Sequence, residues 1–264
     1  MKRLFKPLAA IIIMCLILPV ATTAKPKAKS RDYYEIRVYH VATQQQEATV
    51  DNYLQKALLP TLHNKGVARV GVFKALANDT AADKRIYVLI PHKSVDQFVS
   101  LSQQLLNEPS LQDAGTDYLN TTYDKPPFTR FETILISAFD EMTKMEVPNH
   151  KTPKSERVYE LRSYEGPTEK LYKNKVEMFN KGGEVKLFNR LGFNAVFYGE
   201  VIAGSRMPNL MYMTTFENMP ARMEHWKSFS SDPEWKVLSA KPEYQHNVSK
   251  SDIIFLRPTD YSDI

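Results

Sequence analysis

Alternating polar and apolar residues open the second half of the chain, and a helical pattern follows. Residues 158–164 alternate and are rich in strand-forming side chains, which predicts a β-strand. From residue 168 to residue 191, apolar side chains recur at helical spacing. The pair Gly182-Gly183 interrupts this stripe, and each glycine costs a helix about 1 kcal/mol relative to alanine. We therefore expect a helix with a break at the two glycines.

The rest of this half predicts two further strands, a second helical region and a closing strand. Strands are expected at 193–202 and 210–216, and Pro220 suits the first turn of the next helix. The segment Asp232-Pro-Glu-Trp235 predicts a short helix that Asp232 caps and that Pro233 begins. With a last strand over 252–256, the predicted order of elements is βαββαβ.

The first half of the chain repeats these marks. The segment Tyr34-Glu-Ile-Arg-Val-Tyr39 recurs 125 residues later as Tyr159-Glu-Leu-Arg-Ser-Tyr164. Three further matches follow in the same order at offsets of 124 to 126, the last being Asn107-Glu-Pro109 with Ser231-Asp-Pro233. A nearly constant offset predicts a tandem duplication.

The duplicated βαββαβ order is typical of α+β proteins of the ferredoxin-like kind, in which both helices cover one face of an antiparallel sheet. We predict two tandem ferredoxin-like domains, at 32–140 and 157–264, joined by a linker at 141–156. Two such sheets can cover each other, so we expect them to pack as an intramolecular dimeric α/β barrel.

The first 24 residues predict a cleaved secretory signal. Three basic residues precede an apolar run at 8–20, and small residues suited to cleavage follow at 21–24. An uncleaved anchor is the alternative, but the run is shorter than the roughly 20 residues of a spanning helix. We expect a periplasmic or secreted protein without a stable membrane span, which begins with a short basic leader at 25–31.

Charge and cysteine content exclude several functions. The signal holds three of the 35 Lys and Arg residues and none of the 30 Asp and Glu residues, so the remaining chain is nearly neutral. This balance is no argument for a nucleic-acid partner, which would need clustered cations. Cys15 is the only cysteine and lies in the signal, which excludes disulfides, thiolate nucleophiles and cysteine-bound metals from the mature chain.

Several segments of the second half carry a family resemblance. They are the strand 158–164, the turn after Leu191-Gly192, the segments Phe197-Tyr-Gly-Glu200, Asn209-Leu-Met-Tyr212 and Asp232-Pro-Glu-Trp235, and the ending 256–264. Together they resemble the NIPSNAP family, and more narrowly its exported bacterial members with two tandem domains. The resemblance covers 157–264 and reaches 32–140 only through the repeat.

What this resemblance implies is a dimeric α/β-barrel fold without a settled reaction. Animal relatives are associated with mitochondria and vesicle traffic, in a targeting context that this chain lacks. Other families on the same barrel include cofactor-independent monooxygenases, haem-degrading enzymes and small-molecule binders, so the fold alone assigns no activity.

Established catalytic and metal-binding motifs are absent from the sequence. It has no glycine-rich dinucleotide or phosphate loop, no G-x-S-x-G and no H-E-x-x-H, and its six histidines are scattered. A metal site would have to be assembled from distant residues, which nothing local supports. We therefore predict neither a metal nor a cofactor.

Strand alternation suggests a polar lining for the barrel. Because neighbouring side chains on a strand face opposite sides, Tyr159 and Leu161 share one face with Ser163. We expect this face to meet the helices and the other face to line the barrel interior. The predicted ligand-binding residues on that interior face are Glu160, Arg162, Tyr164, Asn194, Tyr198, Glu200 and Tyr212.

The same residues are also typical of a structural role. Glu and Arg two apart on a strand commonly form an ion pair, and tyrosines often fill barrel interiors. The first half has Ala68, Val72 and Lys74 where the second has Asn194, Tyr198 and Glu200. If a pocket exists, this difference predicts that the second half forms most of it.

Two functions fit the sequence. One is a non-catalytic binding or interaction module, whose partner is an unknown protein or a small apolar or aromatic ligand. The alternative is a cofactor-independent monooxygenase or isomerase, with Glu200 or His225 as base and Arg162 stabilising an oxyanion. His225 also suits the rim of a helix that buries Trp226 as core. One chain is enough to close one barrel, and the oligomeric state is left open.

Overall fold

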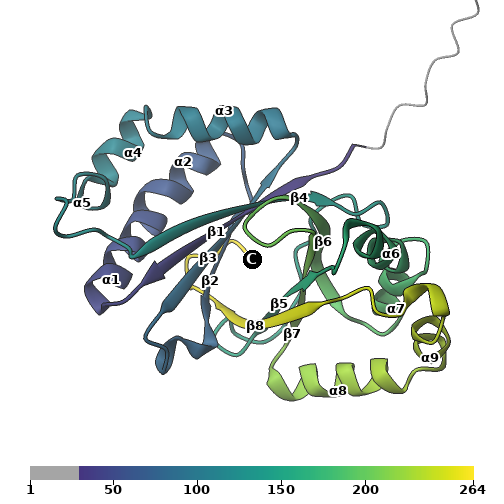
Figure 1. The fold of residues 1–264 in the computed structure, drawn as a ribbon. Helices are drawn as coiled ribbons and strands as arrows, with labels where there is room; N and C mark the ends of the chain where they lie inside the picture. The colour runs from purple at the N-terminus through teal and green to yellow at the C-terminus, as the bar shows by residue number, and fades with distance from the viewer. Residues whose placement is uncertain (1–29) are drawn as a thin grey trace, which may run out of the picture.

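Eight antiparallel strands close into a barrel in the computed structural model, which describes residues 30–264 (Figure 1). The predicted signal at 1–24 and residues 25–29 of the basic leader lie outside the described residues. Strands β1 to β4 belong to the first half of the chain, and β5 to β8 belong to the second. Their bounds are Tyr33–Val41 for β1, Gly71–Ala75 for β2, Lys84–His92 for β3, Arg130–Ala138 for β4, Val158–Glu165 for β5, Asn194–Ala203 for β6, Asn209–Phe216 for β7 and Lys250–Pro258 for β8.

Each half contributes four neighbouring strands, and two seams join the halves. The order around the barrel is β1-β3-β2-β8-β5-β7-β6-β4, and β4 pairs with β1 to close it. The seams are β2 with β8 and β4 with β6. Because every pairing is antiparallel, β1, β2, β5 and β6 all begin at one end of the barrel. The predicted mixed α/β barrel, closed within one chain, is confirmed.

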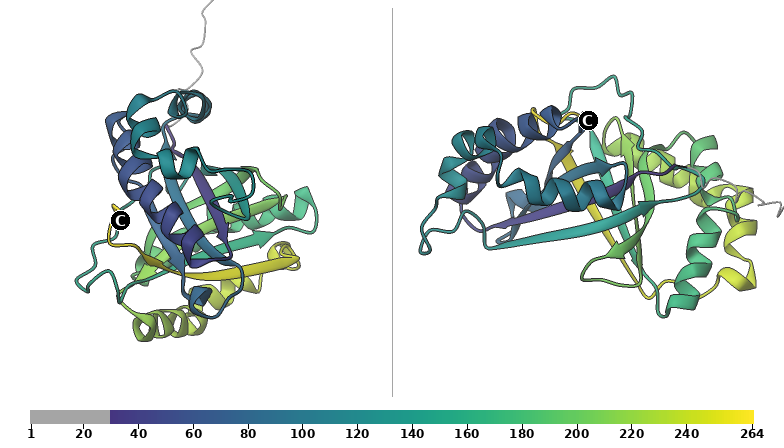
Figure 2. Two further views of the ribbon diagram at one scale, coloured as in Figure 1. Left: turned by 90° about the vertical axis from the view of Figure 1, so that its left-hand side faces the viewer. Right: turned by 90° about the horizontal axis from the view of Figure 1, so that it is seen from above.

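Helices cover the barrel on two sides, one set from each half (Figure 2). The first set comprises α1 (Gln44–Tyr53), the π-helical η1 (Leu54–Leu58), α2 (Leu59–Asn64), the short η2 (Leu76–Asp79), α3 (Val95–Leu105), α4 (Pro109–Ala114) and α5 (Thr116–Leu119). The second set comprises α6 (Glu169–Phe179), α7 (Glu184–Arg190), α8 (Met219–Ser231), α9 (Pro233–Ser239) and η3 (Pro242–Tyr244). Within residues 30–264, no helix is both long and apolar enough to cross a membrane.

Local sequence signals explain where the helices of the second half begin and end. The predicted break is confirmed, since α6 ends before Gly182 and α7 begins after Gly183, whose positive φ of 97° suits glycine. The predicted cap is also confirmed, because the Asp232 carboxylate accepts hydrogen bonds from the N–H groups of Glu234 and Trp235 at the start of α9.

Residues 30–264 form three hydrophobic cores. One lies inside the barrel and contains side chains of both halves, including Tyr34, Ile36, Tyr159 and Leu161. The other two lie between the barrel wall and the helices of each half. The prediction that Tyr159, Leu161 and Ser163 face the helices is therefore wrong: this face lines the barrel interior. Both faces of β5 are buried, so apolar character alone does not distinguish them.

One end of the barrel is closed by two segments that follow its strands. Met145, after β4, and Ile264, after β8, both pack into the barrel core. The backbone N–H of Asp263 donates to Val70, just before β2, which places Ile264 at the end where β1 and β2 begin. We call this the closed end of the barrel and the opposite end its mouth.

The predicted linker, residues 141–156, contains no helix or strand but is anchored at the end of β7. The Glu217 carboxylate accepts hydrogen bonds from the backbone N–H groups of Lys151 and Thr152 and from the Thr152 hydroxyl. The Glu217 carboxylate is one of several attachments of this segment, because the Glu146 N–H also donates to the carbonyl oxygen of Val196 in β6.

Candidate functional site

Glu160, the central residue of the predicted polar lining, lies beneath α8 and not inside the barrel. Its fully buried carboxylate accepts hydrogen bonds from Arg162 Nε at 2.5 Å, from Arg222 Nε at 2.7 Å and from the Trp226 indole N–H at 3.0 Å. The predicted placement of Glu160 and Arg162 inside the barrel is wrong, because α8 supplies the partners that this buried charge needs.

Arg162 and the tyrosines next to it continue the same layer. The Arg162 guanidinium lies 3.8 Å from the centre of the Trp226 ring and donates to the Tyr164 hydroxyl at 2.8 Å. The hydroxyls of Tyr164 and Tyr212 are 3.0 Å apart, and burial raises the pKa of Tyr212 well above its usual value. This satisfied network favours the structural ion pair over an open ligand site.

The other predicted site residues do not converge. Asn194 is exposed at the start of β6, whereas Glu200 lies further along and holds Tyr172 and Lys173 of α6. The buried Tyr198 hydroxyl has no hydrogen-bond partner in the part of the chain that the structure describes, and Nδ1 of His225 lies 3.1 Å from the carbonyl oxygen of Leu191. None of these hydrogen bonds joins two of the residues Asn194, Tyr198, Glu200 and His225. Their part in ligand binding or catalysis stays a prediction.

The mouth of the barrel contains a cavity of about 410 Å³, which we call the mouth cavity. Its apolar part is formed by Val38, Tyr87, Ile134, Val201, Met211 and Ile254. These side chains come from both halves, but most residues of the complete lining belong to the second half, in agreement with the predicted asymmetry, although they are not the residues that the sequence predicted. The cavity-lining positions Ser163, Val201 and Met211 are sequence neighbours of predicted site residues, one step away on the opposite strand face.

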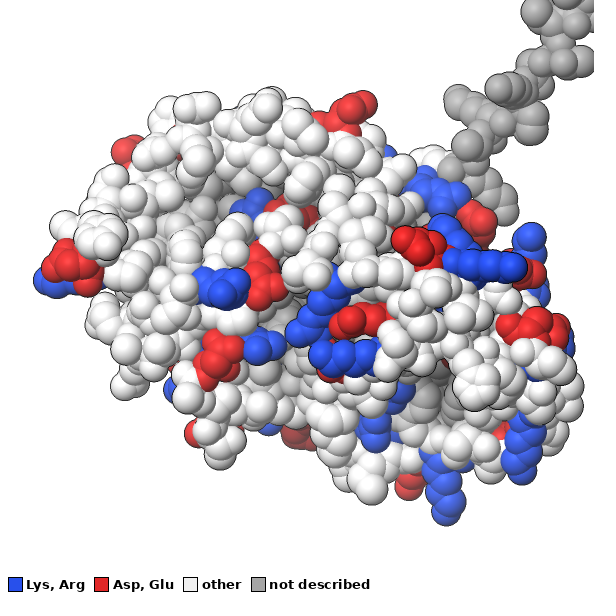
Figure 3. Space-filling model, viewed as in Figure 1, with Lys and Arg blue, Asp and Glu red and all other residues white. Residues whose placement is uncertain are grey.

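Charged side chains and one histidine surround this apolar floor. They are His40, Arg85, Glu132, Arg206, Lys250 and Asp252. In Figure 3, basic and acidic side chains gather near the middle of the face shown, between the two helical sides. The mouth cavity therefore combines an apolar interior with a rim of both charges.

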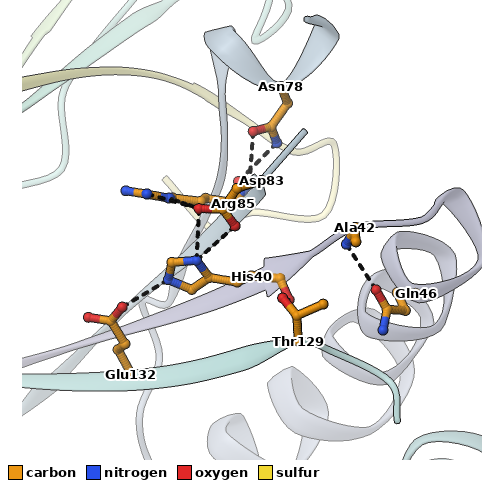
Figure 4. Close-up of polar contacts among 8 residues, drawn as sticks. All are labelled: His40, Ala42, Gln46, Asn78, Asp83, Arg85, Thr129 and Glu132. Carbon is orange, nitrogen blue, oxygen red and sulfur yellow. Dashed lines mark hydrogen bonds and ion pairs between the residues drawn. The ribbon is translucent and has the colours of Figure 1, made fainter. Parts of the chain in front are cut away.

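His40 has a polar contact at each of its ring nitrogens (Figure 4). It extends from β1 between Asp83, which directly precedes β3, and Glu132 of β4. Its Nδ1 lies 2.8 Å from Asp83 Oδ1, and its Nε2 lies 2.9 Å from Glu132 Oε1. Both ring nitrogens face carboxylate oxygens, so both contacts are hydrogen bonds only when both nitrogens carry hydrogen.

Arg85 fixes the position of Asp83 beside this histidine. Its Nε and a terminal nitrogen donate to Asp83 Oδ2 at 3.0 and 2.9 Å, and Asn78 holds its backbone on both sides. Burial alone would raise the pKa of Asp83, but hydrogen bonds from Arg85 and His40 lower it. Across the mouth, Arg206 pairs with Asp252. Polar contacts thus hold His40, Arg85 and Arg206 in place where they border the mouth cavity.

The sequence pattern missed the rim because its residues are far apart in the chain. His40 follows the repeated Glu-x-Arg-x-Tyr segment directly, but the second half has Glu165 at that position of the repeat. The position of His40 near the end of a predicted strand was the signal that could have found this site, because polar groups at strand ends commonly border ligand sites. Within residues 30–264, no group of three or more His, Cys, Asp or Glu side chains is arranged to hold a metal ion.

Comparison with known proteins identifies one family and one fold. The NIPSNAP family model matches residues 159–263, and no curated protein matches the chain. A candidate monooxygenase from Fusobacterium nucleatum is similar in structure over 87% of this chain and 93% of its own, with 10% identity and a TM-score of 0.53. A second, from Lactobacillus acidophilus, covers 86% and 94% at 11% identity and a TM-score of 0.53. At such identities the likeness shows the fold alone.

Proposed function

Residues 159–263 are a NIPSNAP domain, as the sequence predicted, and we propose that the protein is a binding module whose ligand occupies the mouth cavity. Both halves build this cavity, and we attribute them to a tandem duplication of a ferredoxin-like domain. Because the two halves of one chain form the cavity, we expect one chain to be sufficient to bind the ligand.

The observation that carries this proposal is the combination of an apolar floor with a charged rim in one cavity. Ligand pockets are mostly apolar, with a few polar groups that orient the ligand, and they measure about 300 to 1,000 Å³. The mouth cavity, at about 410 Å³, fits this description. We infer a small ligand with an apolar or aromatic body and one polar group that meets Arg85, Arg206 or Glu132.

The contacts of His40 favour binding over proton transfer at the mouth. A general base needs a nitrogen that is free to accept a proton from the substrate. Here Asp83 and Glu132 occupy both nitrogens of His40. His40 therefore joins the neighbouring strands of the rim, while Arg85 and Arg206 remain the groups best placed to orient a ligand.

A cavity-filling variant tests the proposal. Ile254 borders the cavity and is partly exposed, so Ile254→Trp fills the mouth without overpacking the core. Val237→Trp on the exposed face of α9 is the matched control. The expected result, in thermal-shift and calorimetric titrations with aromatic acids, amines and neutral aromatics, is saturable binding by the wild type and the control and none by Ile254→Trp. Equal binding by Ile254→Trp, or no binding by the wild type, would refute the mouth cavity as the site.

We also propose that the protein is exported, on the signal-like pattern of residues 1–24. Expression with its own N-terminus and mass determination of the product test this. A mature chain that begins near residue 25 in the periplasm or medium supports export, and a full-length cytoplasmic chain contradicts it.

A further inference from the structure

The barrel wall has a gap beside the mouth cavity, because β2 ends before its two neighbours do. The last residue of β2, Ala75, lies opposite Leu256 of β8. From there β8 extends towards the mouth as far as Lys250, and β3 extends past the end of β2 as far as Lys84. Within residues 30–264, no strand pairs with residues 250–255 on the side of β2. The wall is therefore open between β3 and β8 at the mouth end of the barrel.

A second cavity, of about 460 Å³, lies at this gap. Four residues line both this cavity and the mouth cavity: Arg85 and Tyr87 of β3, and Ile253 and Ile254 of β8. These four residues belong to the two strands that flank the gap. The mouth cavity therefore continues through the gap into the second cavity, which we call the side groove.

The chain that follows β2 forms the outer wall of the side groove. It turns away from the barrel into η2, where the side-chain amide of Asn78 is buried. This amide accepts from the backbone N–H of Arg85 and donates to the carbonyl oxygen of Arg85, both at 2.9 Å (Figure 4). Asn78 thus satisfies the backbone of β3 where β2 has ended, and these bonds fix η2 beside the gap.

Apolar side chains form most of the lining of the side groove. Leu76, Ala77 and Ala81 come from the chain after β2, and Ile253 and Phe255 come from β8. The two alanines have small side chains, which leaves space between this chain and β8. Ile253 is 44% exposed, so an apolar occupant would remove its side chain from water.

The polar side chains of the side groove already have partners. Besides the phenol of Tyr87, they are those of Asn78, Asp83 and Arg85. Asn78 binds the backbone of Arg85, whereas Asp83 accepts from Arg85 and contacts His40. A polar occupant would have to compete with these contacts, but a hydrocarbon chain leaves them intact. The side groove therefore suits an apolar chain.

The mouth cavity, in contrast, has a charge available for a polar head group. Both carboxylates of its lining are engaged, since Glu132 contacts His40 and Asp252 pairs with Arg206. Lys250, the first residue of β8, also lines the cavity and forms no ion pair with any residue in 30–264. The available charge at the mouth is positive, which favours an anionic head group.

We propose that the ligand of the mouth cavity is an alkyl carboxylate, whose chain passes between β3 and β8 into the side groove. The inference rests on the function proposed above for the mouth cavity and names the class of its ligand. The carboxylate lies at the rim near Arg206 and Lys250, and the alkyl chain covers Ile253 and Phe255.

A chain-length series tests the proposal. Calorimetric titrations of the full chain use butanoate, hexanoate, octanoate and decanoate, each below its critical micelle concentration, and benzoate as a probe of the mouth cavity alone. Each methylene group that enters the side groove should raise the affinity about two- to fourfold, until the groove is full. A single alkanoate should bind per chain.

Variants of the groove wall separate this site from non-specific binding of alkyl chains. Ala77→Trp and Ala81→Trp each place a large side chain in the lining, and each should abolish the rise in affinity with chain length. Ala82→Trp is the matched control, because Ala82 is exposed in the same connection and does not line the groove. This control should retain the rise, and all three variants should bind benzoate like the wild type.

Three results would overturn the proposal and leave the mouth cavity standing as a ligand site. The first is binding of benzoate by the wild type without a rise in affinity from butanoate to decanoate. The second is a rise that Ala77→Trp and Ala81→Trp both retain in full. The third is a wild type that binds aromatic amines or neutral aromatics but none of the acids. Absence of binding by every probe would refute the mouth cavity itself, and the proposal with it.

Discussion

The indole N–H of Trp226 on α8 donates to the Glu160 carboxylate on β5 across 3.0 Å. Arg222, one helical turn earlier, reaches the same carboxylate at 2.7 Å, and Arg162 reaches it from the strand. Helix and sheet are therefore joined through one buried negative charge shared by two arginines. The ion pair of the strand becomes part of the attachment of α8 to the barrel.

Replacing Glu160 with alanine should destabilise the protein strongly. The change leaves two largely buried guanidinium groups, Arg162 and Arg222, without their counter-charge, which typically costs about 3 to 5 kcal/mol. The free energy of unfolding from urea titrations measures the loss. Glu224→Ala, on the exposed side of the same helix, should change stability by less than about 0.5 kcal/mol. A similar small effect for both variants would show that the shared charge contributes little.

Three tyrosines should respond differently to loss of the hydroxyl group. The buried hydroxyls of Tyr34 and Tyr198 have no hydrogen-bond partner among the described residues, so Tyr34→Phe and Tyr198→Phe should leave stability unchanged or raise it. Tyr164→Phe removes the acceptor of an Arg162 hydrogen bond and should cost about 1.5 to 3 kcal/mol. Thermal unfolding of the three variants measures these differences. A loss above about 1 kcal/mol for Tyr34→Phe would mean that its hydroxyl has a partner.

Attachment of the linker should weaken in acid. Hydrogen bonds from the Thr152 hydroxyl and from the N–H groups of Lys151 and Thr152 lower the pKa of Glu217 from 4.5 to about 2, and nearby His150 acts in the same direction. The folded-state pKa lies below the unfolded one, so the stabilisation is complete above about pH 4.5 and is lost as pH falls towards 2.

Stability measurements on the wild type and Glu217→Gln across this range check the attachment. The wild type should be the more stable protein at pH 6, and the difference should disappear near pH 2. A difference that is the same at both pH values would contradict the role of the Glu217 charge.

Closure of the barrel end should depend on Ile264. This side chain is 3% exposed and packs among barrel-core residues, so Ile264→Ala should cost about 2 to 5 kcal/mol. Ile253→Ala is the matched control, because Ile253 is 44% exposed and should lose less than about 1 kcal/mol. Chemical denaturation of both variants tests this, and equal losses would show that Ile264 does not contribute as a core residue.

Local signals in the sequence were sufficient to predict these strands and helices. Strand alternation from Val158 and the helix break at Gly182-Gly183 appear in the structure as β5 and the gap between α6 and α7. The Asp232 cap and the closed barrel also agree with the prediction. These features depend on backbone preferences and on periodicity, which neighbouring residues determine. The repeated Glu-x-Arg-x-Tyr segment likewise marked β1 and β5 as equivalent strands.

Only the tertiary structure decided which face of each strand lines the barrel and where cavities form. A period of two separates Glu160 from Leu161 but does not say which side the helices cover, and here both sides are buried. The charge of Glu160 is stable beneath α8 because Arg222 and Trp226, more than 60 residues away in sequence, supply its hydrogen bonds. His40 likewise acquires its surroundings from residues distant in sequence. The sequence by itself determined the elements and their repetition, whereas the partners of each buried charge came from packing, because those partners meet only when the chain folds.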